Sequence, residues 1–224
     1  MALNVIMLGA PGAGKGTQAE LFARAHGLPK ISTGDMLREG IKQQLPLALL
    51  AKERMDRGEL VDDETMIGIV RERLGRQDTK EGFILDGFPR TVFQGRALDG
   101  IMADRHNGAL IVVDVVVPEE ELVRRLAARR ICSACGTNAE SGDSVCRRCG
   151  GTLVHRTDDD EGVVRERFRV YTQESKPLLD YYRGRPTFCA VNGAQLPERV
   201  FQEVEAAING AARAAARHSV GAQG

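Results

Sequence analysis

The chain of 224 residues carries no net charge, because 31 lysine and arginine residues balance 31 aspartate and glutamate residues. Nucleic acids and anionic membranes attract an excess of positive charge, so this balance supports neither as a partner. No apolar run approaches the roughly 20 residues that a membrane-spanning helix needs, and no basic and apolar leader is recognisable at the start. These absences favour a soluble, intracellular protein, long enough for one α/β domain with insertions.

The first informative stretch is an apolar run, Ala2–Leu8, followed by the loop Gly9-Ala-Pro-Gly-Ala-Gly-Lys-Gly-Thr17. The run is typical of a buried strand, and the residues after the loop have helix-forming composition. A Gly-rich loop between a strand and a helix holds phosphate with its backbone N–H groups, and Lys15 adds a positive charge. The sequence therefore predicts a nucleoside-phosphate site. Gly16 stands where the usual loop has Ser or Thr, which leaves metal ligation by Thr17 open.

Five apolar segments alternate with helical patterns: Ala2–Leu8, Lys30–Ser32, Phe83–Leu85, Ala109–Val117 and Thr187–Val191. Strands that alternate with helices indicate βαβ units and a parallel sheet. The fourth segment is almost wholly apolar, as expected of a strand covered on both faces. Ligands of such sheets gather at the carboxyl ends of the strands, so motifs at those ends are candidate site residues.

The second segment runs into Ser32-Thr-Gly-Asp-Met-Leu-Arg38. Thr33 is predicted to cap a helix, and Arg38 lies about a turn and a half further on. A helical stretch, interrupted at Pro46, continues to Leu60, and a second helix is expected to start near Asp62. This excursion predicts an appended lobe, although ordinary crossover helices with a solvated Arg38 would give the same pattern.

The third segment ends in Leu85-Asp-Gly-Phe-Pro-Arg90. An acid such as Asp86, at the end of a strand beside a phosphate loop, is where Mg²⁺ is usually reached, directly or through water. Arg90 offers a planar fork for phosphate. Gln94 can share a helical face with Arg90 and read a base edge. The alternative is a tight turn with a surface arginine.

Three blocks, Gly9–Gln18, Ser32–Arg38 and Asp86–Thr91, resemble the signature blocks of adenylate kinase, and the similarity continues to about Ile208. The resemblance implies a P-loop kinase with a parallel five-stranded core sheet flanked by helices, a helical lobe for the nucleoside monophosphate (NMP) and a small zinc-bearing lid. The core would comprise residues 1–31, 62–127 and 160–224, the NMP-binding lobe residues 32–61, and the lid residues 128–159.

The resemblance also implies the substrate-binding residues and a cis Phe88–Pro89 bond. Residues expected to contact ATP are Gly12, Ala13, Gly14, Lys15, Gly16, Thr17, Arg129 and Gln195. Residues expected to contact AMP are Thr33, Arg38, Glu59, Leu60, Val61, Gly87, Phe88, Pro89, Arg90, Gln94, Arg156 and Arg167.

A helix is expected after Pro118, which suits a first turn and is followed by three glutamates that complement the helix dipole. Arg125 and Arg129 are four residues apart, so both side chains are predicted to aim at one point. Two converging guanidinium groups repel unless an anion joins them. A triphosphate is the natural occupant.

Two knuckles follow, Cys132-Ser-Ala-Cys135-Gly and Cys146-Arg-Arg-Cys149-Gly. Four cysteines in two such pairs predict a closed tetrahedral metal site, read as structural zinc. The alternatives are a redox pair or disulfides. The segment between the knuckles is too short and polar to build its own core, so metal is expected to supply its fold. His155 is a weaker candidate for a fifth ligand.

This lid departs from the zinc-bearing lids that it resembles. The segment between the knuckles is several residues shorter, and Thr137-Asn138-Ala139 stands where the family often has an aromatic or histidine residue. Donor-base selectivity is therefore left open. Beyond the lid, Asp158 and Asp159 match acids associated with lid closure but could equally cap a helix. The Ala/Gly-rich end, from Ala206 to Gly224, is expected to fray.

The inventory favours phosphoryl transfer to a phosphate, which is already anionic at neutral pH and needs no general base. Residues expected to align and neutralise the two polyanions, or to anchor Mg²⁺, are Lys15, Asp86, Arg90, Arg125, Arg129, Arg156 and Arg167, with Asp35 a weaker anchor. The expected reaction is ATP + AMP to two ADP, and the resemblance implies a cytoplasmic monomer. One alternative is a kinase that uses another nucleoside monophosphate as acceptor or another nucleotide as phosphate donor. The other alternative is a zinc ribbon that binds nucleic acid, but the ribbon lacks the aromatic residues on which bases stack.

Overall fold

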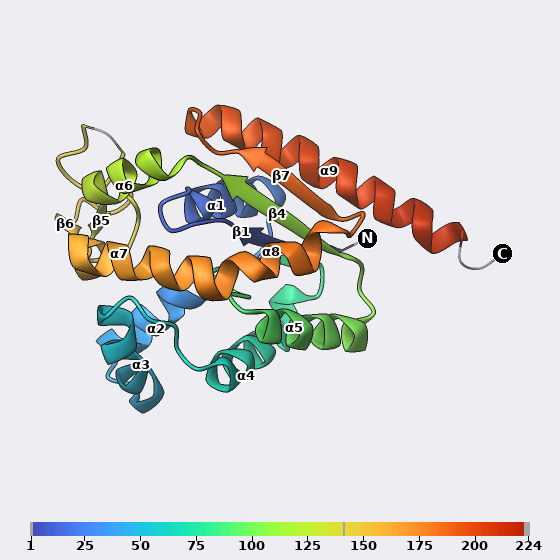
Figure 1. Ribbon diagram of the computed structural model, residues 1–224, viewed down its shortest axis with the longest axis horizontal. Helices are drawn as coiled ribbons and strands as arrows, with labels where there is room; N and C mark the ends of the chain where they lie inside the picture. The colour runs from blue at the N-terminus through green and yellow to red at the C-terminus, as the bar shows by residue number, and fades with distance from the viewer. Residues whose placement is uncertain (1, 141, 222–224) are drawn as a thin grey trace.

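The computed structural model describes residues 2–140 and 142–221. At its centre lies a parallel sheet of five strands in the order β2-β3-β1-β4-β7 (Figure 1). Its strands are β1 (Leu3–Leu8), β2 (Lys30–Ser32), β3 (Gly82–Asp86), β4 (Leu110–Val116) and β7 (Phe188–Asn192). Every predicted strand is confirmed, with ends that agree to within one residue.

The register brings the carboxyl ends of the strands to one edge. Met7, in the central strand, pairs with Asp86 in β3, which in turn pairs with Ser32 in β2. On the other side, Leu8 pairs with Asp114 in β4. The phosphate loop leaves β1 at this edge, so the loop and the predicted motifs after β2 and β3 are neighbours in space.

Helices cover both faces of the sheet, which explains why its strands read as apolar runs. On one face, Ile6 and Val112 pack in a core with α4 (Asp63–Leu74), α5 (Val92–Arg105) and α8 (Lys176–Arg183). On the other face, Val5 and Ile84 pack in a second core with α1 (Lys15–His26) and α9 (Pro197–Gly221). All four strand residues are fully buried.

Two short helices, α2 (Thr33–Lys42) and α3 (Pro46–Asp56), form the excursion between β2 and α4. Pro46 occupies the first turn of α3, where its missing N–H costs nothing. The prediction that Thr33 caps α2 is wrong. Ser32 is the N-cap instead: its backbone is extended, and its hydroxyl accepts a hydrogen bond from the Asp35 amide at 3.3 Å. Thr33 is already the first residue of the helix.

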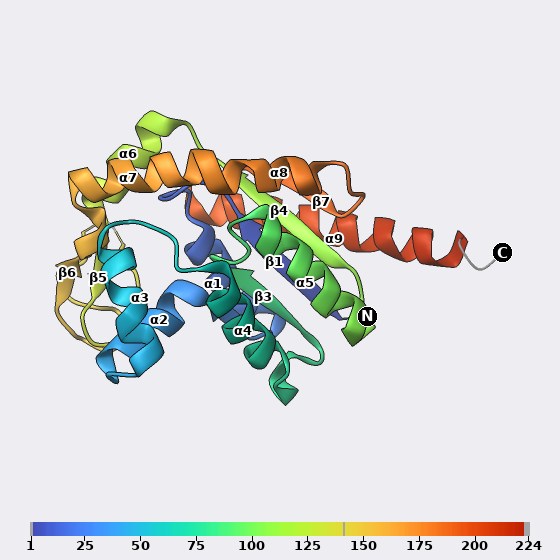
Figure 2. The same ribbon diagram turned by 60° about the horizontal axis from the view of Figure 1, so that its bottom comes forward.

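The second insertion follows α6 (Glu119–Ala128). It contains an antiparallel pair that the sequence did not predict, β5 (Arg130–Cys132) with β6 (Leu153–His155). A 3-10 turn, η2 (Thr157–Asp159), leads into α7 (Glu161–Val170) and a π-helical segment, η3 (Tyr171–Ser175), which continues into α8. Both views place this insertion at the end of the molecule that also holds α2 and α3 (Figure 2). A second 3-10 turn, η1 (Gln77–Thr79), precedes β3.

The expectation that the chain frays from Ala206 is wrong as far as Gly221, because α9 is continuous from Pro197 to that residue. Val204 and Ile208, spaced one turn apart, are fully buried and fix the helix against the sheet. His26, at the end of α1, lies 3.1 Å from Glu205. Residues 222–224 lie outside the described part of the chain. Within that part, no helix is both long and apolar enough to span a membrane.

Candidate active site

The phosphate loop depends on glycine where the backbone passes close to other elements. A Cβ atom on Gly9, whose φ is +134°, would lie 2.5 Å from the Val115 carbonyl oxygen. A Cβ on Gly12, whose φ is +84°, would lie 3.0 Å from the Leu122 carbonyl oxygen. Both positions therefore exclude side chains. The loop ends on the N-terminus of α1, where free N–H groups favour an anion.

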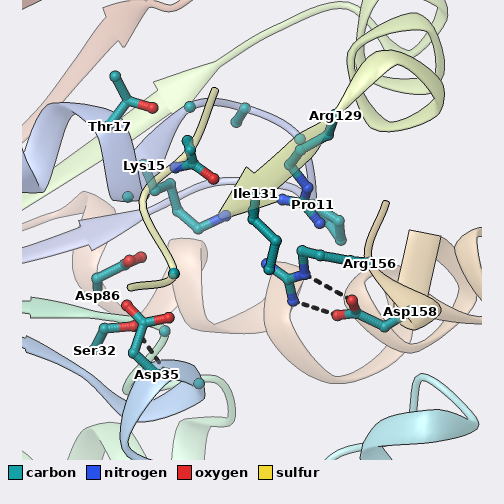
Figure 3. A pocket seen from close by; sticks show the side chains of 18 of the residues that line it. Pro11, Lys15, Thr17, Ser32, Asp35, Asp86, Arg129, Ile131, Arg156 and Asp158 are labelled. Carbon is teal, nitrogen blue, oxygen red and sulfur yellow. Dashed lines mark hydrogen bonds and ion pairs between the residues drawn. The ribbon is translucent and has the colours of Figure 1, made fainter. Parts of the chain in front are cut away.

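Lys15 lies at the centre of the site. Its ammonium donates to the Ala10 carbonyl oxygen at 2.8 Å and extends into the space between Asp86 and the lid arginines Arg129 and Arg156 (Figure 3). Burial lowers the pKa of Lys15 to about 8, against the opposing pull of the Asp86 charge. Lys15 is therefore mostly charged at neutral pH, and the negative charge of a bound phosphate would raise its pKa back toward the usual value.

Gly16, the departure from the usual loop, has a steric explanation. A Cβ at this position would lie 3.0 Å from the Oδ2 atom of Asp86. The missing side chain therefore makes room for the predicted acid beside Lys15. Thr17 lines the same cleft one residue further along α1.

The block after β3 folds back on the start of α2. The hydroxyl of Thr33 donates to the Gly87 carbonyl oxygen at 3.0 Å, and the Arg90 Nε donates to the same oxygen at 2.8 Å. The Phe88–Pro89 bond is cis, as predicted. Phe88 itself is only 1 % exposed and packs in the hydrophobic core, so it anchors this block to the core and does not line the cleft.

The expectation that Arg90 and Gln94 share a helical face is wrong, because α5 begins only at Val92. Gln94 instead accepts from the Arg90 amide at 2.7 Å and donates to the Asp63 carboxylate at 2.7 Å. Asp63 also accepts from the Thr91 hydroxyl. Sequence reasoning missed Asp63, since an acid in the first turn of a helix is ordinarily explained by the helix dipole alone.

Arg38 lines the cleft, and its guanidinium pairs with Asp35, three residues earlier. Burial would raise the pKa of Asp35, but the charge and hydrogen bond of Arg38, together with Lys30 and Ser32, outweigh burial and lower it. Glu59 is exposed and pairs with Arg57 at 2.9 Å. Leu60 and Val61 line the cleft beside it.

Two aspartates hold the three lid arginines. Arg129 pairs with Asp159 at 2.6 Å, Arg156 pairs with Asp158 at 2.7 Å, and Arg167 reaches Asp159 at 2.9 Å. The interpretation of these acids as helix caps is wrong, because both lie in η2 and bind side chains. Burial would raise the pKa of Asp158, but Arg156 and its neighbours outweigh that effect and lower it to about 2. The two carboxylates thus offset the repulsion between the three positively charged arginines and allow them to lie together in one cleft.

Arg125 and Arg129 do not share one target, contrary to prediction, although both line the cleft. Arg125 is in α6 and bonds to Glu121 at 2.8 Å and to the Gly193 carbonyl oxygen at 2.9 Å. Arg129 follows the last residue of α6, so helical spacing no longer applies to it. The amide of Gln195 donates to the Asn192 carbonyl oxygen at 2.9 Å and to Glu203 at 3.0 Å.

The four lid cysteines come together as predicted, with their sulfur atoms within 4.8 Å of one another. The closest pairs are Cys132 with Cys149 and Cys135 with Cys149, each at 3.4 Å, and Cys135 lies 3.5 Å from Cys146. None is in a disulfide. Tetrahedral zinc with Zn–S bonds of about 2.3 Å sets sulfur atoms about 3.8 Å apart, so this set fits the metal. Among the described residues, His155 is not part of the group.

One continuous cleft of about 1890 Å³ joins these parts. Every residue predicted to bind a nucleotide or to act in catalysis lines it, except the buried Phe88. The first knuckle contributes Cys132 and Cys135 to its wall, and the second contributes Arg147 and Arg148. The core, the α2–α3 lobe and the lid therefore enclose a single space large enough for two nucleotides.

Comparison with known proteins identifies the family. The model of the family described as adenylate kinase matches residues 7–186. This chain belongs to the adenylate kinase family. Among its curated relatives, the adenylate kinase of Archaeoglobus fulgidus is 50% identical over 210 residues, which cover 91% of this chain and 97% of that protein. The adenylate kinase of a Geobacillus species is 45% identical (93% and 99% covered), and that of Bacillus subtilis is 44% identical (93% and 99% covered).

Proposed function

We propose that this chain catalyses the reversible transfer of a phosphoryl group from ATP to AMP, giving two ADP. The observation that carries the proposal is the single cleft that joins the phosphate loop to the Thr33, Arg38 and Arg90 side of the site. Such a cleft can align two nucleotides phosphate to phosphate. Membership of the adenylate kinase family supports the same reaction.

The donor phosphates would lie on the loop and the N-terminus of α1, with Lys15 at the transferring group. The acceptor phosphate would lie between Arg38 and Arg90. Its second pKa is about 6, so it is already a nucleophilic anion at neutral pH, and no side chain needs to remove a proton. Alignment and charge neutralisation are then the main work of the protein.

The lid arginines would complete that neutralisation. Arg156 and Arg167 are held by Asp158, and Arg129 by Asp159, so the guanidinium groups are preorganised beside Lys15. Arriving phosphates would share these groups with the acids. Since the lid and the α2–α3 lobe wall the same cleft, their closure would exclude water and prevent hydrolysis of ATP.

Asp86 is the proposed anchor for Mg²⁺, which would bridge the donor phosphates and neutralise their charge. Asp86 lies beside Lys15 at the end of β3, and the space left by Gly16 keeps its carboxylate near the loop. Asp35 is a weaker anchor, because Arg38 and Lys30 already pair with it. Cys132, Cys135, Cys146 and Cys149 would hold a structural zinc ion.

A cytoplasmic monomer is the proposed working form. Free thiols at the metal site suit a reducing compartment. A monomer suffices, because one chain supplies every proposed contact. Gel filtration with light scattering tests this expectation.

The decisive test measures ADP formation from Mg-ATP with AMP, UMP, CMP, GMP and no acceptor in parallel. Turnover confined to AMP is expected. Turnover with a pyrimidine monophosphate would replace the acceptor, while ATP loss without an acceptor would show that closure does not exclude water. Repeating the series with GTP as donor tests the donor base, for which the short lid offers Thr137 and Asn138 to the cleft.

A further inference from the structure

The α2–α3 lobe touches the metal knuckle directly. Lys42, the last residue of α2, donates from its Nζ to the carbonyl oxygen of Ser133 at 3.3 Å. Ser133 is the second residue of the first Cys-x-x-Cys knuckle, 91 positions along the chain. Both residues line the cleft. The contact therefore joins the two walls that must approach each other when the cleft closes.

A second contact shows that the lobe is docked and that the lysine does not merely reach across solvent. Gly58, just after α3, lies against α7, the helix that leads out of the lid. A Cβ atom on Gly58 would lie 2.9 Å from Arg167 Cγ and 3.0 Å from the Val163 carbonyl oxygen. With φ at +75° and so little room, Gly58 permits this close approach. The lobe thus meets the lid side at two separate points.

The peptide group that Lys42 holds is also part of the metal site. The carbonyl of Ser133 and the N–H of Ala134 belong to one peptide unit. That unit lies in the turn between the ligands Cys132 and Cys135, where the amide of Cys135 donates to the sulfur of Cys132 at 3.5 Å. An ammonium on the Ser133 carbonyl therefore helps to fix the turn that sets the positions of these two sulfur atoms.

We propose that Lys42 is a positioning residue that couples closure of the α2–α3 lobe to metal retention by the knuckle. In the closed arrangement its ammonium holds the Ser133 peptide and faces a site whose four thiolates outweigh the charge of one divalent ion. Closure then tightens metal binding, and the metal favours closure by the same factor. The proposal rests on the proposed function, because nucleotides would drive closure.

The first experiment measures zinc release from the zinc-loaded protein into a chromogenic chelator. It is run without nucleotide and with AMP plus a non-hydrolysable ATP analogue. Nucleotides are expected to slow release from the unaltered protein, and the Lys42 contact to contribute about 2- to 10-fold of that slowing, the range for one net hydrogen bond. In Lys42→Met the slowing by the same nucleotides should be smaller by that factor. Lys42→Arg, which keeps the charge and the reach, restores the slowing.

Lys52→Met is the matched control. Lys52 is exposed in α3 and pairs with Asp56 within that helix, so its loss alters the charge of the lobe but not the contact with the knuckle. It should behave as the unaltered protein does. Equal loss of slowing in Lys42→Met and Lys52→Met would overturn the proposal, because a general charge effect would then explain it.

Calorimetry on the same samples separates this proposal from the proposed function. If AMP and the ATP analogue do not bind, the proposed function fails and the coupling fails with it. If they bind but zinc release does not slow, only the coupling fails. Linkage gives a reciprocal check: zinc removal should weaken nucleotide binding about 2- to 10-fold more in the unaltered protein than in Lys42→Met. A protein that retains no zinc would also overturn the coupling.

Discussion

The core and the lid enclose the same cleft but are held together by different means. In the core, strand residues such as Ile6, Ile84 and Val112 are fully buried, and apolar burial together with the pairing of the strands fixes the sheet. In the lid, among the described residues from 128 to 159, the buried apolar residues are two cysteines, Cys132 and Cys146. We therefore expect the lid to depend on the proposed metal ion and on arginine–aspartate pairs. We call the side of the cleft that the core supplies the rigid wall. The side that the lid supplies is called the conditional wall, because we expect it to keep its shape only while the metal ion and the ion pairs are in place.

This difference suits a site that must open and close. Elements with few buried apolar contacts open at low free energy, while core strands open only with the whole molecule. The phosphate loop, which must hold the donor in register, is on the rigid wall. Arg129, Arg156 and Arg167, which on the proposed mechanism reach phosphate only in the closed state, are on or beside the conditional wall. Four predictions test this division.

The largest effect is expected at the rigid wall. Lys15→Met removes the charge at the transferring phosphoryl group and should lower kcat about 10²- to 10³-fold, the usual cost of one such donor. The fold should survive, because the ammonium is bonded only to the Ala10 carbonyl among the described residues. Steady-state ADP formation measures the change, with the exposed Lys80→Met as control. A loss under 10-fold would contradict the assigned role of Lys15.

Much of the rigid wall could be predicted from the sequence. All five strands and the phosphate loop are local or periodic signals, the family resemblance implied the cis Phe88–Pro89 bond, and the structure confirms all of them. The conditional wall was harder to predict. The β5–β6 pair contains three residues per strand, too few for periodicity to register, and the convergence of Arg125 with Arg129 failed where α6 ends. Helical spacing is informative only while the helix lasts.

Polar contacts across long separations escaped the sequence for a related reason. Asp63 binds Gln94 31 residues away, and Asp159 binds Arg129 30 residues away. Each residue alone has an ordinary local explanation, as a first-turn acid or a helix cap. Only the folded chain shows which partner is near. The four cysteines were the exception, because their chemistry demands a common partner whatever the fold.

The second effect breaks the core and spares the lid. Ile84→Ala leaves a cavity in the central region of the sheet and should lower the free energy of unfolding by about 3 kcal/mol. Urea denaturation measures this loss. The zinc content of the folded fraction should not change, because the metal site makes no use of the sheet. Loss of zinc before global unfolding would show that the two regions are coupled more tightly than argued.

The third effect concerns the charge pairs of the conditional wall. The folded pKa of Asp158 is about 2, below its usual 3.8, so the carboxylate stabilises the fold above that usual value. As pH falls through the window from about 4 to about 2, this contribution of about 2 kcal/mol is lost. Asp158→Asn should remove the dependence. The difference in urea midpoint between the two proteins, measured from pH 6 to pH 2, isolates this carboxylate from other acid effects.

The smallest effect on global stability, and the most direct test of the comparison, comes from the metal site. Cys146→Ser, or chelation of zinc, removes what folds the lid, yet should change the free energy of unfolding of the core, measured in urea, by less than about 1 kcal/mol. The lid itself should open far more often, so trypsin should cut after Arg147 or Arg148, both exposed on the second knuckle, about 10-fold faster or more. Cys189→Ser, which alters a half-buried thiol in β7 and leaves the knuckles intact, is the control. A core that unfolds together with the lid would mean that the metal stabilises the whole molecule, and the division between a rigid and a conditional wall would fail.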